Sequence, residues 1–281
     1  MDKITYNPGI INKIGKKILS LARFIMSENS FKNFMLYVHA IYKSLQRNKY
    51  LMYLLVKFIF LTGNDKKKYY YVYKLFPFTM GGSKALENAF EMTSYVDRNN
   101  IEGSIVECGV AEGGTSAMMA LTNKNGGYNE RNFYLFDSFE GLPNPSAEDF
   151  KNGKTGDFIR PLDEGDCLGK IEDVEKLFFD KFNFSKNKIN LIKGWFQDTI
   201  PNFKLSEKIA ILRLDGDWYD STRIPLENFY HKISVGGVII IDDYATCYGS
   251  KKAVDEFIMK KNIIINLKPD GRGGAWFIKE K

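Results

Sequence analysis

Carboxylates that follow apolar runs are the residues of this chain best suited to chemistry. Asp215 follows the run IAILRL, and the pair Asp242-Asp243 follows GGVIII. Both runs are typical of central strands in a parallel sheet that is covered on both faces, and the carboxyl ends of such strands meet at one edge. Three carboxylates gathered there repel one another unless a cation relieves them. Because oxygen ligands without His or Cys suit Mg²⁺, or else Mn²⁺ or Ca²⁺, we predict a divalent-metal site at Asp215, Asp242 and Asp243.

The same acids have a structural alternative. Asp243 could cap a following turn, and Asp215 could pair with Arg213 or Arg223. The residue types alone leave this alternative open.

A glycine-rich turn follows an earlier apolar run, SIVECGV. The turn continues through Ala111-Glu112-Gly113-Gly114-Thr115 into a predicted helix. Glycines let the backbone approach a ligand closely, and the start of the helix offers free N–H groups. Neither a Gly-Lys-Ser/Thr phosphate loop nor GxGxxG occurs in it. By itself the turn is also consistent with tight packing of a strand against a helix.

Asp137 ends the next apolar run, in LFDSFEGLP. An acid at this place can accept hydrogen bonds from both hydroxyls of a ribose. Its distance in sequence from the glycine turn is long, which an enlarged loop over Asn123–Arg131 explains. The turn and the acid together predict an adenosine-containing ligand.

A sheet covered by helices on both faces would position these residues. Strand-like runs alternate with helical segments, which predicts a doubly wound α/β fold. The predicted strands lie at 104–110, 132–137, 188–194, 209–217, 236–244, 263–267 and 274–279, and the predicted helices end at Ala120 or cover 84–98, 171–182, 221–232 and 250–261. A long polar segment occupies 143–170.

The first 75 residues differ in charge from the rest. They hold 14 Lys and Arg against Asp2, Glu28 and Asp65, a formal charge of +11, so the remaining 206 residues carry −5. A basic amphipathic helix is predicted near 11–25, with an apolar face at Ile11, Ile14, Ile18, Leu21 and Ile25 and a basic face at Lys13, Lys16, Lys17 and Arg23. Helices near 29–47 and 49–62 should follow, before a polar break at 63–68.

These features divide the chain into an N-terminal helical extension, residues 1–75, and a main domain, residues 76–281. The extension could pack on the domain or on a second subunit of a homo-oligomer, or it could contact a membrane surface. No nucleic-acid-binding motif accompanies the charge.

Composition narrows the class of protein. The 281 residues are 44% hydrophobic and 26% charged, as in globular domains. Cys108, Cys167 and Cys247 lack metal-site spacing and are interpreted as buried thiols in a reducing compartment. We predict a cytoplasmic protein, because no secretory signal is evident and the apolar run Tyr50–Thr62 contains Lys57 and is short for a membrane span. That run is predicted to be a buried helix.

Six ordered motifs resemble those of the macrocin O-methyltransferase family. They are ECGVAEGGTS, LFDSFEGLP, KGWFQDTIP, LRLDGDWYDST, LENFYHKISVGGVIIIDDY and KKAVDEF. The likeness runs from Phe78 to Phe277. It implies a class I, Rossmann-like methyltransferase sheet of seven strands with the last strand antiparallel. It also implies an enzyme that transfers a methyl group from S-adenosylmethionine to a sugar hydroxyl, with Mg²⁺ or Mn²⁺.

The resemblance also implies roles for particular residues. The cofactor's methionine part would lie on the glycine turn, the ribose on Asp137 and the adenine beside the KGWFQDTIP segment, and Asp215, which borders the cofactor, would bind the metal with Asp242 and Asp243. The implied cofactor contacts are Glu107, Gly109, Val110, Gly113, Asp137, Ser138, Phe196, Gln197 and Asp215. One departure is that Ala111-Glu112 stands where the family usually has an aromatic residue and an arginine.

Neither His39 nor His231 is well placed to take the proton of a sugar hydroxyl, so Asp215 or Asp217 is the expected acceptor. Trp218, Tyr219 and Tyr244 either stack on the sugar or anchor loops, and Lys251 and Arg272 are candidate substrate contacts. Two other functions stay open: a non-catalytic cofactor-binding or assembly protein, and a dinucleotide-dependent oxidoreductase. The acceptor could be a glycan, a nucleotide sugar or a glycosylated natural product.

Overall fold

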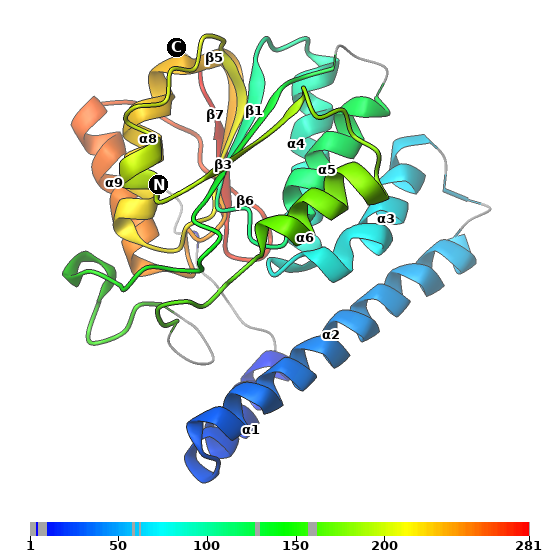
Figure 1. Cartoon of the computed structure of the whole chain (residues 1–281), viewed down its shortest axis with the longest axis vertical. Coiled ribbons are helices and arrows are strands. Elements are labelled where there is room, and N and C mark those ends of the chain that lie inside the picture. The colour runs from blue at the N-terminus through cyan, green and yellow to red at the C-terminus, as the bar shows by residue number, and fades with distance from the viewer. Residues whose placement is uncertain are drawn as a thin grey trace.

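A seven-stranded sheet forms the centre of the molecule (Figure 1). The computed structural model describes residue 4 and residues 10–57, 60–61, 63–126, 130–156 and 162–280. The strand order is β3-β2-β1-β4-β5-β7-β6. The strands are β1 (Ser104–Cys108), β2 (Phe133–Asp137), β3 (Ile189–Lys193), β4 (Ile209–Leu214), β5 (Ile233–Ile241), β6 (Lys268–Pro269) and β7 (Ala275–Ile278).

Strands β1 to β5 are parallel, and β7 is antiparallel to both β5 and β6. The predicted doubly wound α/β fold with an antiparallel last strand is therefore confirmed. Strand β4 lies at the middle of the sheet, with β5 beside it, as their apolar sequences indicate.

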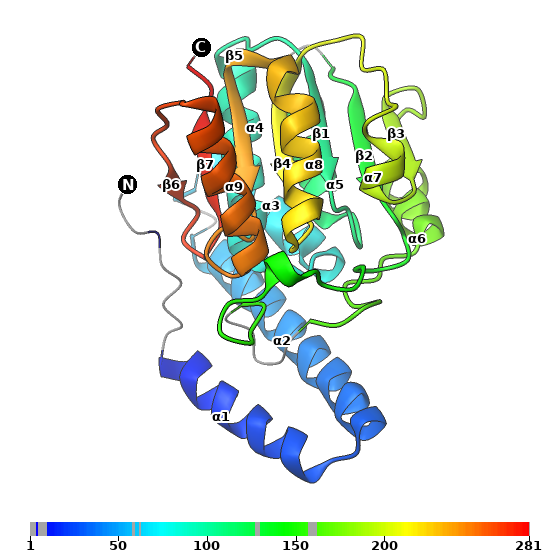
Figure 2. The ribbon, with the colours of Figure 1, turned by 90° about the vertical axis from the view of Figure 1, so that its left-hand side faces the viewer.

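Helices cover both faces of the sheet, with α8 and α9 on one side and α4 and α5 on the other (Figures 1 and 2). The helices are α1 (Ile10–Ile25), α2 (Glu28–Lys57), α3 (Gly63–Leu75), α4 (Gly82–Arg98), α5 (Gly114–Lys124), α6 (Ile171–Glu175), α7 (Phe196–Thr199), α8 (Tyr219–Phe229) and α9 (Tyr248–Lys261). Short 3₁₀ turns at Phe76–Phe78, Ala147–Asp149 and Tyr230–Lys232 and a π-helical turn at Lys176–Lys181 complete the list.

Alternate residues of each strand enter different cores. Ile105 and Ile211 pack with α4 and α5, whereas their neighbours Val106 and Leu212 pack with α8 and α9. This follows from the two-residue period of a strand, which sends successive side chains to opposite faces. Both faces are apolar, so the strands appear in the sequence as continuous apolar runs.

Several predicted boundaries differ from the structure. The helices expected at 29–47 and 49–62 are one helix, α2, up to Lys57, because the junction contains no Gly or Pro to end it; residues 58, 59 and 62 lie outside the described residues. The polar segment 63–68 begins α3 instead of separating helices. The strand expected at 263–267 is not formed. Ile263, Ile265 and Leu267 pack against the core in alternation, but no described strand pairs with them.

The run Tyr50–Thr62 was expected to be a buried helix, and this was wrong. Among the described residues of the run Tyr50 alone is buried, while Met52, Leu55 and Val56 are exposed. On α1, the described members of the predicted apolar face, Ile18, Leu21 and Ile25, are exposed as well; the side chains of Ile11 and Ile14 lie outside the described residues. Helix α3 differs, because Val72 and Leu75 are wholly buried in the main core.

A buried ion cluster links the central strands. Arg213 of β4 lies opposite Glu107 of β1 in the strand register, and both side chains are at most 1% exposed. Its guanidinium donates to Glu107 at 2.6 Å, to Asp215 at 2.7 Å and to Asp242, which follows β5, at 2.5 Å. One cation therefore ties together three neighbouring strands.

We predict that Arg213→Met lowers the free energy of unfolding by about 3–5 kcal/mol, because it leaves buried carboxylates without their partner. Urea unfolding followed by circular dichroism measures this. The matched control is Arg223→Met. Arg223 also pairs with two acids, Asp220 and Glu227, but at the exposed surface of α8, where the loss should be at most ~1 kcal/mol. Equal losses in both variants would contradict a structural role for Arg213.

Candidate active site

A cavity of about 310 Å³ opens at the carboxyl ends of the parallel strands. Its wall combines residues that follow β1, β2, β4 and β5 with loop residues that are distant in sequence. The lining residues that the predictions named are Gly109, Asp137, Ser138, Phe196, Gln197, Asp215, Asp217, Asp242, Asp243 and Arg272. The fold thus brings most of the predicted site into one space.

Gly109 allows β1 and β4 to approach closely at the cavity floor. Its φ is +97°, and a Cβ there would collide with the backbone carbonyl of Asp215. Gly113 also has a positive φ, +82°, but as the residue before α5 it packs toward Leu177 and Val174. Gly113 and Val110 are not among the described lining residues of the cavity.

Asp137 is held by the glycine turn. Its Oδ2 accepts hydrogen bonds from the N–H groups of Val110 at 2.7 Å and Ala111 at 2.9 Å, and its Oδ1 accepts one from Phe139 at 2.7 Å. Burial raises the pKa of Asp137, and the three N–H groups oppose that rise. The acid of β2 and the turn after β1 therefore form one unit facing the cavity.

Glu107 lies beneath the cavity and is not among its described lining residues. Its carboxylate is fully buried and accepts hydrogen bonds from Thr115 at 2.7 Å and from Ser116, besides the contact with Arg213. Burial raises the pKa of Glu107, whereas Arg213 lowers it. In this structure Glu107 supports the site from below.

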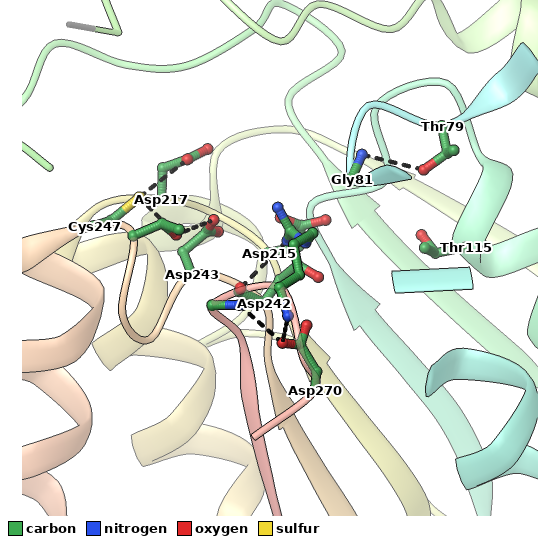
Figure 3. A network of polar contacts seen from close by, with 12 residues as sticks. Thr79, Gly81, Thr115, Asp215, Asp217, Asp242, Asp243, Cys247 and Asp270 are labelled. Carbon is green, nitrogen blue, oxygen red and sulfur yellow. Dashed lines mark hydrogen bonds and ion pairs between the residues drawn. The ribbon is translucent and has the colours of Figure 1, made fainter. Parts of the chain in front are cut away.

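Asp215, Asp242 and Asp243 converge at the ends of β4 and β5 (Figure 3). One carboxylate oxygen of each lies within 4.8 Å of the others. Oδ2 of Asp243 is buried, and no donor among the described residues faces it. A buried carboxylate oxygen without a partner is costly, and a bound cation would satisfy it.

The pairing of these acids with arginine, which the sequence left open as an alternative to a metal site, is also present. Asp215 contacts Arg213, and Asp242 contacts both Arg213 and Arg272, while Arg223 binds Asp220 and Glu227 instead. Arginine pairing and a metal site are therefore compatible features of this cluster.

Asp217 faces the far side of Asp243. Its φ is +59°, a conformation that few non-glycine residues adopt. Its Oδ1 accepts a hydrogen bond from the Cys247 thiol at 3.3 Å, and Asp217, Asp243 and Cys247 form a second group whose ligand atoms lie within 4.8 Å of one another. Burial and the neighbouring Asp215 carboxylate raise the pKa of Asp217 to about 7.

The net charge of the site is negative. Glu107, Asp215, Asp217, Asp242 and Asp243 face only two guanidinium groups, those of Arg213 and Arg272, among the described residues. Fully ionised, the cluster would carry a formal charge of −3. A divalent cation would offset most of this negative charge. The all-oxygen ligand set of Asp215, Asp242 and Asp243 suits Mg²⁺ or Mn²⁺.

Of the three predicted aromatic residues, Trp218 and Tyr244 anchor loops in this structure, whereas Tyr219 joins α8 to α9. Trp218 is 2% exposed and donates from its indole N–H to the Pro143 carbonyl at 2.8 Å. The Tyr219 hydroxyl contacts Glu256, and the Tyr244 hydroxyl contacts Asp255. None of the three is among the described lining residues of the cavity.

The two candidate cations differ in position. Lys251 pairs with Asp255 and Tyr244 outside the described cavity wall. Arg272, on the glycine-rich turn before β7, lines the cavity. Of the two, Arg272 is therefore the one placed to meet a ligand.

Sequence reasoning missed part of the wall. Met80, Gly81, Leu142, Pro143, Cys167, Trp195, Gly216 and Ser221 also line the cavity. These residues carry no charged group, and apart from Ser221 of α8 they lie outside the strands and helices, where the sequence has no periodic pattern. The central role of Arg213 had a usable signal, because an arginine inside the apolar run IAILRL requires buried acidic partners.

Comparisons with known proteins agree with this geometry. The protein-family profile described as macrocin-O-methyltransferase (TylF) matches residues 30–279, so the match begins in α2, well before Phe78. A demethyldecarbamoylnovobiocin O-methyltransferase from Streptomyces niveus is 34% identical over 200 residues, which are 71% of this chain and 74% of that protein.

Two further relatives support the assignment. An 8-demethyl-8-(2,3-dimethoxy-alpha-L-rhamnosyl)-tetracenomycin-C 4'-O-methyltransferase from Streptomyces olivaceus is 33% identical over 70% of this chain and 74% of its own length. The solved structure of the O-methyltransferase NovP has a TM-score of 0.63 at 33% identity, covering 73% of this chain and 83% of that one. With the class I fold and the profile match, these relatives show that the chain is an O-methyltransferase belonging to the macrocin O-methyltransferase family.

Proposed function

We propose that this chain transfers a methyl group from S-adenosylmethionine to a sugar hydroxyl in a divalent-metal-dependent reaction. The observation that carries the proposal is that the ribose-type acid Asp137 and the acids Asp215, Asp242 and Asp243 line one cavity. The names of the curated relatives support a sugar-bearing acceptor, since one of them names a rhamnosyl group. A glycan, a nucleotide sugar or a glycosylated natural product would present such a hydroxyl.

The wall of the cavity suits the cofactor. Gly109 presents bare backbone, Asp137 offers a charged acceptor for ribose hydroxyls, and Phe196 and Gln197 are placed to border the adenine. Ser138 contributes to the same wall, while its hydroxyl donates to the Gly141 carbonyl at 2.9 Å and so stabilises the loop after β2. Val110 and Gly113 would act indirectly, through Asp137 and through the start of α5.

Asp215, Asp242 and Asp243 are the residues that would hold the metal. When bound, the ion would acidify a sugar hydroxyl and S-adenosylmethionine would supply an electrophilic methyl group. The chain's own contribution is to orient these carboxylates. Arg213 holds Asp215 and Asp242 from below, and the unpartnered oxygen of Asp243 faces the cluster.

Asp217 is the acceptor we favour for the hydroxyl proton. A general base works best when its pKa lies near the working pH, and burial together with Asp215 raises the pKa of Asp217 to about 7. Asp217 also lines the cavity. Asp215 is the second candidate, because it lies at the same strand end.

The remaining proposals concern location and partners. Among the described residues, no helix has the length and apolar character needed to cross a membrane. We propose a cytoplasmic enzyme whose N-terminal helices contact a partner, either a second copy in a homo-oligomer or the surface of a membrane. A purely non-catalytic assembly role is disfavoured, because a scaffold gains nothing from clustered acids that repel one another.

The first test is cofactor binding. We expect wild-type protein to bind S-adenosylmethionine in calorimetric titration, and Asp137→Asn to bind about 10–100-fold more weakly, because a charged hydrogen-bond acceptor is lost. Asp173→Asn, on an exposed residue of α6 that is not among the described lining residues of the cavity, should bind as wild type does. Unchanged affinity in Asp137→Asn would remove the ribose assignment.

The second test is metal binding in the absence of catalysis. Adding MgCl₂ or MnCl₂ should raise the melting temperature, since an ion that binds only the folded state stabilises it. We expect Asp243→Asn to lose this rise and the exposed Asp220→Asn to keep it. A rise of the same size in Asp243→Asn would place the ion elsewhere.

The third test distinguishes the metal ligand Asp215 from the general base Asp217. We predict that Asp215→Asn loses both the metal-dependent rise in melting temperature and methyl transfer, while S-adenosylmethionine affinity stays nearly intact. Asp217→Asn should keep the rise and lower kcat by about 10²–10⁴-fold. If Asp217→Asn turned over at the wild-type rate, the proton would have to go to another group.

A further inference from the structure

A buried thiol lies beside the acids at the end of β5. Cys247 is 1% exposed, and its Sγ donates a hydrogen bond to Oδ1 of Asp217 at 3.3 Å. In Figure 3, Asp243 lies between this pair on one side and Asp215 with Asp242 on the other. The reaction proposed above does not use the thiol, so a group that can bind metal ions stands next to the site without a role.

The local backbone fixes the thiol in this place. The turn after β5 is tight, because the N–H of Cys247 donates to the carbonyl of Asp243 at 3.0 Å, as in one turn of a helix. Cys247 is also the N-cap residue of α9. The partial positive charge at the start of a helix favours a thiolate over a thiol. The chain therefore presents a sulfur atom that a metal ion can deprotonate and bind.

Asp217, Asp243 and Cys247 form a compact set of ligand atoms, which we call the thiol subsite. Their ligand atoms all lie within 4.8 Å of one another, and the three residues are 8%, 6% and 1% exposed. A bound zinc ion would draw such atoms to about 3–4 Å from one another, since its bonds to oxygen and sulfur are about 2.0–2.3 Å long. The thiol subsite therefore needs only a small adjustment to hold one ion.

The carboxylate of Asp243 supplies an independent sign of a cation. Its Oδ1 accepts a hydrogen bond from Oγ1 of Thr246 at 3.1 Å, whereas its buried Oδ2 has no donor among the described residues. Asp243 belongs both to the thiol subsite and to the set of acids that we propose for Mg²⁺. A carboxylate can bridge two ions that lie about 3.5–4 Å apart. One incompletely satisfied side chain can therefore serve both sets.

The charge of the site accommodates two divalent ions. Fully ionised, its described acids and guanidinium groups carry a formal charge of −3. One divalent ion reduces this charge to −1, and deprotonation of Cys247 returns it to −2. A second divalent ion, at the thiol subsite, brings the sum to zero. Two ions therefore neutralise the buried cluster, which one ion does not.

Ligand type determines which ion the thiol subsite favours. Magnesium prefers oxygen ligands alone, whereas a thiolate selects softer ions such as Zn²⁺. Zinc accepts three protein ligands of mixed oxygen and sulfur type and leaves a fourth position open. Asp217 lines the cavity, which gives an ion a route to the thiol subsite. We propose that the thiol subsite is a second metal site, which binds Zn²⁺ through Asp217, Asp243 and Cys247 beside the magnesium ligands.

Zinc at the thiol subsite inhibits methyl transfer. Asp217, our proposed proton acceptor, cannot take a proton while its carboxylate binds an ion. This consequence rests on the proposed function, whereas zinc binding itself does not. With MgCl₂ present, zinc should inhibit Cys247→Ser on the order of a hundredfold more weakly than wild type, because one of three ligands is lost. Equal inhibition of both proteins would show that zinc acts elsewhere.

Cobalt is the spectroscopic probe of the thiol subsite. Full-length wild type in MgCl₂ should develop a near-ultraviolet sulfur-to-cobalt charge-transfer band when CoCl₂ is added, and ZnCl₂ should remove the band, because zinc binds such ligands more tightly than cobalt. Cys247→Ser should lack the band. Cys167→Ser is the matched control and should keep it, because Cys167 lines the cavity but is not among the described residues of either ligand set.

Two outcomes of the cobalt experiment would overturn the proposal. The first is wild type without a charge-transfer band. The second is a band that is lost in Cys167→Ser and kept in Cys247→Ser, since the ion would then bind the other thiol. A band in a protein that does not bind S-adenosylmethionine would support the thiol subsite and remove the proposed function.

Melting temperature distinguishes the two metal sites. Asp215→Asn should lose the rise with MgCl₂ and keep the cobalt band, whereas Cys247→Ser should keep the rise and lose the band. The rise also verifies that Cys247→Ser is folded. If it is not, Asp217→Asn replaces it, since asparagine tolerates the left-handed φ of +59°, and should bind cobalt on the order of a hundredfold more weakly. Loss of both signals in folded Asp215→Asn would show a single metal site and overturn the proposal.

Discussion

The buried guanidinium of Arg213 is the interaction on which the rest of the site depends. An ion inside a sheet is tolerable only when charged partners surround it, because desolvation costs several kcal/mol. Glu107 on β1, Asp215 after β4 and Asp242 after β5 supply those partners. The acids depend on Arg213 in turn. Carboxylates that would otherwise repel one another can stay at one strand edge because a fixed cation lies beneath them. Their charge is only partly neutralised, which leaves room for a divalent ion.

The parallel arrangement of β1, β2, β4 and β5 determines where the chemistry can occur. Their carboxyl ends share one edge, so the backbone of Gly109, the acid Asp137 and the acids after β4 and β5 open into a single cavity. The described parts of the loops above that edge contain isolated bridges, such as Gly156 with Cys247, but no extended hydrogen-bonded ladder. Buried anchors replace it, as in the contact of Trp218 with Pro143 and that of Tyr244 with Asp255.

Helix α2 has two unlike faces. Its inner face uses Lys43, Arg47 and Tyr50 to contact the glycine turn, α3 and α4. Its outer face is exposed and carries large apolar side chains, among them Ile41, Leu45 and Met52. The basic character of the N-terminal 75 residues is thus partly absorbed by internal contacts.

Local patterns determined the sheet and the position of its acids. Apolar runs bounded by polar residues predict strands, and a residue that directly follows a run must lie at the strand end, so Asp137, Asp215, Asp242 and Asp243 were placed by sequence alone. The direction of a side chain and its partners across strands depend on register and on distant loops, which only the tertiary structure decided. Glu107 therefore points beneath the cavity, Trp218 and Tyr244 anchor loops, and Cys167 joins the wall. Likewise, the exposure of Met52, Leu55 and Val56 was decided by packing, because an apolar helix looks the same in sequence whether or not its own core covers it.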